Sequence, residues 1–331
     1  MTSESALYLP QAWADDTERR NKAKVPSDIA LQTKPQISLD QIKAAKAKGV
    51  APGVVLADAG YGHDGGWRAG LTALGLPYAV GILSNLSAWP PGHGPLAPLP
   101  WSGKGRPTSR LRRDEDHQPM PAKALAESLP AEAWQAVTWR EASNAELSSR
   151  FTALRVRPAH KDFTRQEPHP EEWLLIEWPE GESEPTRYWL STLPADTPIH
   201  ELVDIAKLRW RIERDYQELK QELGLGHYEG RGWRGFHHHA SLCIAAYGFL
   251  ISLRETIPPS GPARAEGGKA PAVPEGYRPR GAPDPTRAPC GDLDHDASDQ
   301  TGHSPRPAPP AMSMLQAGHD SITATSQLMT Q

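Results

Sequence analysis

The chain has 331 residues, enough for two or three domains, and a formal net charge of only −4. Such a charge does not indicate a nucleic-acid binder by itself, so any such site must be a local basic patch. Cys243 and Cys290 lie far apart and lack metal-ligand spacing, which argues against disulfides and fits a reducing cytoplasm. The longest apolar run, residues 242–253, is too short to span a bilayer and predicts a buried helix, so we expect no membrane partner.

The first 50 residues predict mostly polar, irregular structure followed by one helix. Residues 7–10 are interpreted as the end of a strand. Asp15 and Asp16 are paired acids that we interpret as a solvated turn or a helix start. Residues 38–48 predict a helix, with Ser38 as its N-cap and Gly49 ending it.

An apolar run at residues 54–60 predicts a buried strand that ends in Asp58. A helix pattern then runs from Asp64 to Leu74, and residues 78–83 predict a second buried strand, which completes a βαβ unit. An Asp at the carboxyl end of a buried strand lies at the sheet rim, where α/β proteins place their chemistry. The alternative for Asp58 is a helix-capping or turn residue.

Residues 85–130 are rich in Pro, Gly and charge, and they contain the strongest local basic patch. The segment 103–113 has no acidic residue, and Trp101 stands just before it; its five cations are Lys104, Arg106, Arg110, Arg112 and Arg113. This composition suits contact with a DNA backbone, and the alternative is a solvated loop. Four aromatic and β-branched segments follow, at residues 133–139, 150–156, 173–178 and 187–191. They predict an antiparallel β insertion.

A helix with three charged residues on one line follows the insertion. Thr197 and Pro198 predict its start, and apolar residues recur at helical spacing from Ile205 to Leu223. Arg209, Glu213 and Lys220 fall on one line beside this apolar stripe. An Arg guanidinium can donate two hydrogen bonds to one phosphate, and a Lys ammonium group can bind a phosphate as a point charge. The alternative is an ordinary amphipathic helix with a salt-bridged flank.

The segment after this helix carries two cations and an aromatic residue among glycines: Arg231, Trp233 and Arg234. This combination suits a DNA strand end or a flipped base. His237, His238 and His239 are adjacent, so on a helix they point in different directions and cannot share one metal. From residue 257 onward the chain is rich in Pro and has neither Trp nor Phe, which predicts a disordered tail.

Three stretches together resemble the bacterial insertion-sequence transposases that carry a Tyr–Arg–Glu–Lys signature. They are residues 56–62 with 74–78 (LADAGYG, LGLPY), residues 209–225 (RWRIE and, after Lys220, QELGL), and residues 227–235 (HYEGRGWRG). In this family the Glu is the last member of an Asp–Asp–Glu metal triad. The chain departs from the signature at Ala206, where the family has its Tyr.

The resemblance implies an α/β fold of the ribonuclease H type, with Asp58 and Glu213 as two catalytic metal ligands. It implies two Mg²⁺ or Mn²⁺ ions in an intact enzyme, because two ions can activate the attacking oxygen and stabilise the leaving one. The first strands and the first Asp have no counterpart in this sequence, so we expect an amino-terminally truncated fragment. The Asp58 strand would then have an open edge.

The expected organisation has four parts. Residues 1–94 form a partial ribonuclease H-like core, 95–196 the basic loop and the β insertion, 197–256 the Glu helix and a closing helix, and 257–331 the disordered tail. The resemblance implies a transposase that acts on double-stranded DNA at transposon ends, in the cytoplasm at the nucleoid. We expect the chain to be inactive alone. The alternative is a non-catalytic remnant that binds DNA, dimerises or pairs with intact transposase, and a generic ribonuclease H-like nuclease is disfavoured by the Arg209 and Lys220 spacing.

Overall fold

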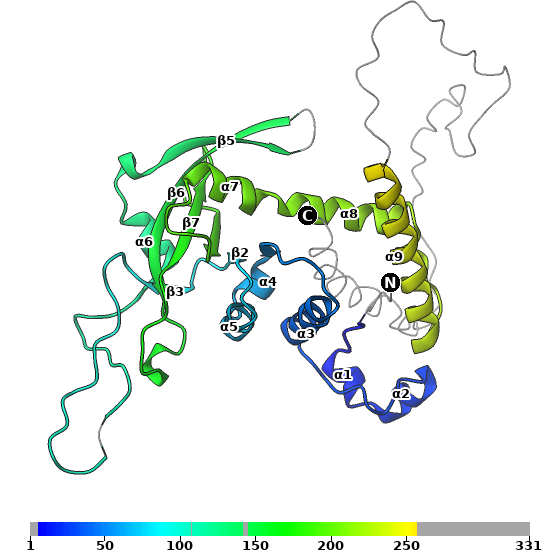
Figure 1. The fold of residues 1–331 in the computed structure, drawn as a ribbon, viewed down its shortest axis with the longest axis horizontal. Helices are drawn as coiled ribbons and strands as arrows, with labels where there is room; N and C mark the ends of the chain where they lie inside the picture. Colours follow the sequence, from blue (N-terminus) through cyan, green and yellow to red (C-terminus); the bar gives the residue numbers. More distant parts are fainter. Residues whose placement is uncertain (1–5, 107, 142–144, 257–331) are drawn as a thin grey trace, which may run out of the picture. The chain divides into compact units, whose positions relative to one another are not determined.

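The computed structural model describes residues 6–106, 108–141 and 145–256 (Figure 1). Residues up to 248 belong to one compact unit, and residues 249–256 are the described part of a second. The disordered tail expected at residues 257–331 lies outside the described residues.

Three helices open the described chain: α1 (Gln11–Ala14), α2 (Thr17–Ala23) and α3 (Lys34–Ala47). Asp16 is the N-cap of α2 and accepts from the backbone N–H of Arg19 at 2.8 Å, as the helix-start interpretation expected. The prediction that Ser38 caps α3 is wrong. Thr33 and Gln36 form a capping box that satisfies two backbone N–H groups, and Ser38 lies buried inside the helix.

The strand expected at residues 7–10 is also wrong, because these residues adopt no regular structure. Leu9 is buried with Ala23 and Val25, and Trp13 and Trp233 pack against this small cluster. The alternating apolar residues therefore serve helix packing and do not pair in a sheet.

The βαβ unit is present as predicted. Strand β1 (Val55–Ala57) leads through α4 (Ala59–Gly62) and α5 (Gly65–Ala73) to β2 (Tyr78–Ile82), and β1 and β2 are parallel. Gly75, at φ +69°, follows α5 in the left-handed conformation that favours glycine at a helix end.

The predicted antiparallel insertion is present and continues the same sheet. Its elements are β3 (Ser87–Trp89), β4 (Met120–Pro121), α6 (Ala122–Glu127), η1 (Ala131–Ala133), β5 (Gln135–Glu141), β6 (Ala145–Pro158), η2 (Asp162–Thr164), β7 (Glu172–Trp178) and β8 (Arg187–Ser191). The strand order is β1-β2-β8-β7-β6-β3-β4, and β5 also pairs with β6. Because β8 hydrogen-bonds to β2, the described chain forms a mixed α/β structure around one open, mostly antiparallel sheet of eight strands.

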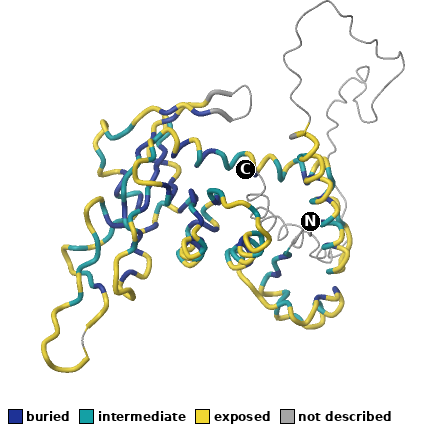
Figure 2. Tube along the Cα trace, in the orientation of Figure 1, coloured by how far each residue is buried: buried dark blue, intermediate teal, exposed yellow. Residues whose placement is uncertain are grey.

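Apolar side chains cover both faces of this sheet, and Figure 2 shows that much of the trace in its strands is buried. One face packs against residues of α3, α5 and α6, including Ile42, Trp67, Leu71 and Leu125. The other face packs against α7 (Ile199–Lys207) through Leu202, Val203 and Ala206. Burial on both faces explains why β2, β7 and β8 are continuous apolar runs.

Glu213 lies on a helix as predicted, but the single helix expected from Thr197 onward is divided into two. Pro198, not Thr197, is the N-cap of α7, and a separate helix, α8 (Arg209–Gln221), follows Leu208 and carries Glu213. The turn η3 (Leu225–His227) leads to α9 (Trp233–Thr256). Within α9, Ala240, Cys243 and Tyr247 are buried, but Leu242 is 58% exposed and Phe249 is 63% exposed, so the helix is less buried than its composition predicts. Among the described residues, no helix has the length and apolar character needed to cross a membrane.

Candidate active site

Asp58 directly follows β1 and begins the short helix α4. Its carboxylate accepts a hydrogen bond from the backbone N–H of Gly60 at 2.9 Å, so the residue is at once the strand-end Asp and the capping Asp of the two interpretations. A carboxylate with one oxygen held in this way has its second oxygen available for another partner.

Two glycines allow the Asp58 turn to lie close against β2. A Cβ atom at Gly62 would stand 2.2 Å from the carbonyl oxygen of Gly81, and one at Gly81 would stand 3.1 Å from the amide nitrogen of Ala59. The buried guanidinium of Arg68, on α5, donates to the carbonyl oxygen of Gly62. The position of Asp58 therefore depends on backbone contacts and not only on its own side chain.

Arg209 joins Asp58 to Glu213. Its guanidinium forms an ion pair with the Asp58 carboxylate at 3.7 Å and donates a hydrogen bond to the Glu213 carboxylate. The side chains of Asp58 and Glu213 are 49% and 65% exposed, and that of Arg209 is 29% exposed. Two carboxylates that are 155 residues apart in the sequence thus contact the same guanidinium group, at a position that is exposed to solvent.

This donor set fits a hard divalent cation in part. Mg²⁺ is held in proteins by one or two carboxylates and keeps several waters, and Asp58 and Glu213 supply two carboxylates open to water. Over the described ranges, no group of three or more His, Cys, Asp or Glu side chains is arranged to hold a metal. The described residues therefore offer two ligands of a site that needs further oxygen donors.

Lys220 lies on α8 with Arg209 and Glu213 but near the other end of the helix. Eleven residues separate it from Arg209 in the sequence, which corresponds to roughly 16 Å of helix rise. Its ammonium group lies over the ring of Tyr216, 4.8 Å from the ring centre. Arg209, Glu213 and Lys220 lie on the same helix, as predicted. Lys220 is not part of the contact in which Arg209 binds the two carboxylates.

A buried ion pair fixes the start of α8 and was not foreseen from the sequence. Lys207, the last residue of α7, donates to both carboxylate oxygens of Glu177 on β7 at 2.8 and 2.9 Å. The ammonium group also lies 4.1 Å from the ring centre of Trp139. Because Arg209 follows Lys207 by two residues, this pair holds the Arg209 end of α8 against the sheet.

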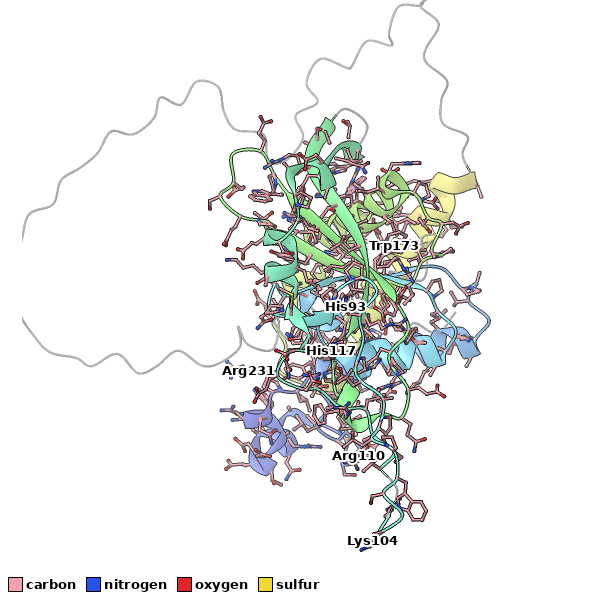
Figure 3. All side chains as sticks on the ribbon, turned by 90° about the vertical axis from the view of Figure 1, so that its left-hand side faces the viewer. His93, Lys104, Arg110, His117, Trp173 and Arg231 are labelled. Carbon is pink, nitrogen blue, oxygen red and sulfur yellow. The ribbon has the colours of Figure 1, made fainter. Side chains whose placement is uncertain are left out.

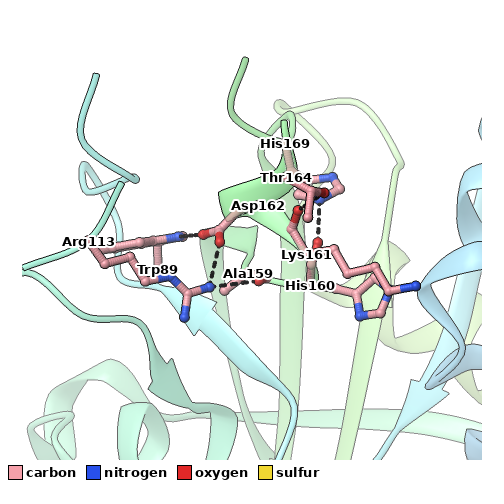
Figure 4. Close-up of polar contacts among 8 residues, drawn as sticks. All are labelled: Trp89, Arg113, Ala159, His160, Lys161, Asp162, Thr164 and His169. Atoms are coloured by element: carbon pink, nitrogen blue, oxygen red, sulfur yellow. Dashed lines mark hydrogen bonds and ion pairs between the residues drawn. The ribbon is translucent and has the colours of Figure 1, made fainter. Parts of the chain in front are cut away.

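The predicted basic residues of segment 103–113 fall into two groups by their contacts, and Figure 3 shows Lys104 and Arg110 along one extended segment. Lys104, Arg106 and Arg110 are exposed and form no ion pair with any other described residue. Arg112 donates to the carbonyl oxygen of Ala97 at 3.1 Å. Arg113 instead pairs with the fully buried Asp162, which also accepts from the indole N–H of Trp89 at 2.8 Å (Figure 4).

The cations expected after α8 are present at the start of α9. Arg231 and Arg234 are exposed, whereas Trp233 is partly buried against the Leu9 cluster. His237 and His239 hydrogen-bond to the carbonyl oxygens of Trp233 and Gly224, each at 2.9 Å. This agrees with the argument that these histidines do not share a metal.

A buried polar cluster lies on the face of the sheet that α5 covers. Burial raises the pKa of the Glu172 carboxyl, and nearby Arg68 partly offsets this increase. Burial also raises the pKa of the Tyr78 hydroxyl, which interacts with Glu172. One oxygen of Glu172 has no hydrogen-bond partner among the described residues. The cluster connects to the Asp58 turn through the Arg68 contact with Gly62.

Comparison with known proteins adds one match. Residues 3–146 match the family model described as DDE superfamily endonuclease. The matched region contains Asp58 and the basic segment and ends before Glu213. No curated protein matches the chain. Over residues 3–146, less than half of its length, the chain is therefore similar to DDE superfamily endonucleases.

Proposed function

We propose that the chain is part of a DDE transposase of the Tyr–Arg–Glu–Lys group, with a fold of the ribonuclease H type. Its substrate is double-stranded DNA at transposon ends, and its location is the nucleoid of a bacterial cytoplasm. One observation carries the proposal: Arg209 brings Asp58 and Glu213 to the same place from opposite ends of the described chain. The matched endonuclease family supports it independently.

In this proposal Asp58 and Glu213 hold Mg²⁺ or Mn²⁺. Bound divalent ions would activate the attacking oxygen and stabilise the leaving oxygen in an in-line displacement at phosphorus. The capping contact with Gly60 orients the Asp58 carboxylate. Arg209 keeps the two carboxylates facing one another and offers N–H donors to a DNA phosphate. Lys220, three helical turns away, is placed for a phosphate farther along the DNA.

In this proposal, further oxygen donors complete the site beside the edge of β1. Among the described strands, β1 pairs on one side only, with β2. A strand added at this open edge would end beside Asp58, since the carboxyl ends of parallel strands meet at one edge of a sheet. We propose that a third carboxylate comes from such a strand and that these 331 residues alone do not cleave DNA.

A second candidate is a non-catalytic remnant that binds DNA, dimerises or pairs with intact transposase. The open β1 edge favours it, because an unpaired strand is a template for another chain. In this case the exposed cations at Lys104, Arg106, Arg110, Arg231 and Arg234 would bind DNA without the carboxylates.

Assays of DNA cleavage and strand transfer with Mg²⁺ and Mn²⁺ test the proposal. The 331-residue chain alone should be inactive. A longer chain that supplies the missing strand should be active and should lose activity with Asp58→Asn or Glu213→Gln. Activity of the longer chain that survives both substitutions would contradict the assignment. Salt-sensitive DNA binding with no activity in either chain would favour the remnant.

A further inference from the structure

The basic segment forms an arm, defined here as residues 95–106 and 108–113, that is held together by its own hydrogen bonds. At its base, Leu96 and Arg112 exchange two backbone hydrogen bonds at 2.9 and 3.0 Å. Farther along, the Thr108 hydroxyl donates to the carbonyl oxygen of Leu99 at 2.9 Å, and the Trp101 indole donates to that of Gly105 at 3.0 Å. These contacts give the arm a defined hairpin-like shape, with Lys104 at its far end (Figure 3).

The base of the arm is attached to the body of the protein through Arg113. Its guanidinium binds both the buried Asp162 carboxylate and the carbonyl oxygen of Ala159, and it lies over the Trp89 ring (Figure 4). His117 packs against the same ring, 4.9 Å between ring centres. A guanidinium with buried partners is not available to DNA, so Arg113 acts as an anchor for the arm.

The outer part of the arm combines exposed cations with exposed apolar side chains. Lys104, Arg106 and Arg110 are exposed, while Trp101 and Leu99 are 59% and 58% exposed. A large aromatic side chain that stays exposed beside several cations matches the requirements of unpaired nucleic acid. Bases stack on the aromatic ring and the cations follow the backbone, whereas a paired duplex offers chiefly phosphates to such a surface.

We propose that the arm is a binding site for single-stranded or unpaired DNA, in which Trp101 stacks on a base and Lys104, Arg106 and Arg110 contact phosphates. This inference rests on the proposed function for DNA as the substrate, and it adds the state of the DNA.

The test measures fluorescence-anisotropy binding of the full chain to a labelled oligonucleotide, single-stranded and as a duplex of the same sequence. Trp101→Ala should weaken single-strand binding about tenfold or more and change duplex binding much less, whereas Trp101→Phe should restore most of the affinity. The double variant Lys104→Ala/Arg106→Ala should lower the slope of log affinity against log salt by about 1.4 on single strands. The exposed pair Lys22→Ala/Lys43→Ala removes the same charge elsewhere and should leave binding unchanged.

Each result has a distinct meaning. Equal losses on both DNA forms, or no loss with Trp101→Ala, would overturn the stacking role while leaving the proposed function intact. Absence of any DNA binding by the full chain would overturn both. Selective loss of binding to anionic phospholipid vesicles, with DNA binding retained in the arm variants, would assign the arm to a membrane surface instead.

Discussion

At the scale of single residues, Arg209 determines the charge of the candidate site. Its guanidinium stands between two carboxylates and neutralises part of their charge. A divalent cation would need the same oxygen atoms, so Arg209 and the cation compete for them when DNA is absent. When DNA is bound, the phosphate offers Arg209 another partner, and the two carboxylates become available.

Replacing Arg209 with Gln should therefore strengthen cation binding. We expect Arg209→Gln to raise the affinity for Mn²⁺ severalfold, because it removes a positive charge next to both ligands. Titration followed by electron paramagnetic resonance of free Mn²⁺ measures the affinity. Arg214→Gln, which removes an exposed charge that pairs with Glu218 on the same helix, is the control and should change little. Weaker Mn²⁺ binding in Arg209→Gln would show that Arg209 orients the ligands more than it competes.

The Lys207–Glu177 pair should be important for stability because both side chains are buried, at 7% and 6% exposure. Lys207→Met leaves the Glu177 carboxylate uncompensated, and we expect it to lower the free energy of unfolding by about 3–5 kcal/mol. Urea denaturation followed by circular dichroism measures this. Arg214→Met, which breaks the more exposed pair with Glu218, should change it by less than roughly 1 kcal/mol. Similar small losses in both variants would contradict the structural role of the buried pair.

The Glu172 carboxyl predicts a particular dependence of stability on pH. Its pKa in the folded protein lies above the ordinary 4.5, chiefly because of burial. A raised pKa means that the folded state holds the proton more tightly, so this contribution to stability is full below pH 4.5. It is lost as the pH rises through the folded-state pKa.

Glu172→Gln should remove that dependence. Compared with the unmodified protein, the variant should gain stability progressively as the pH is raised above 4.5. Thermal denaturation across the pH range measures the difference between the two proteins. A difference that is constant with pH would contradict the raised pKa of this carboxyl.

At the scale of elements, the close contact between α4 and β2 sets the position of Asp58. Gly62→Ala should place a methyl group against Gly81 and Val80, and overpacking of this kind costs typically 1–3 kcal/mol. It should also displace the Asp58 turn and weaken Mn²⁺ binding. Gly248→Ala, where nothing lies within 4 Å of the added atom, is the matched control and should be neutral or slightly stabilising in its helix. A stable Gly62→Ala protein with unchanged Mn²⁺ affinity would contradict this account.

The sequence predicts the elements with regular patterns and misses features that depend on tertiary contacts. Apolar runs predicted β2, β7 and β8, and the spacing of Arg209 and Glu213 predicted one face of α8. Gly81, inside a strand, was the available signal for a close backbone approach. The helix start after Thr33 was missed. Thr33 and Gln36 cap the helix together through a capping box, whereas Ser38 was considered as a single capping residue.

Contacts between residues that are far apart in the sequence do not produce a periodic pattern in it. Lys207 and Glu177 each look like ordinary surface residues in the sequence, and only the folded chain places them together in the core. The same holds for Arg113, which has the composition of a DNA contact but pairs with buried Asp162. Of the candidate site, the strand-end position of Asp58 follows from the apolar run before it, and the helical position of Glu213 follows from the apolar spacing around it. Their role as metal ligands is implied only by the resemblance.

At the scale of the whole molecule, the described sheet places Asp58 at the end of β1, and α8 brings Glu213 to the same guanidinium. The insertion strands extend the sheet from β2 away from β1, and apolar layers cover both faces. The open side of β1 therefore lies next to Asp58, where a further strand would bring additional ligands. The arm lies in the insertion, and we propose it as a separate surface for DNA.

The measurement that tests the central claim most directly is Mn²⁺ binding to the 331-residue chain and to Asp58→Asn, Glu213→Gln and the double variant. Asn retains the capping oxygen of Asp58, so the turn should survive the substitution. If the two carboxylates share a cation, either single substitution should abolish the same binding event, and the double variant should lose no more. Binding that persists in both single variants, or that falls in two independent steps, would contradict a shared metal site at Asp58 and Glu213.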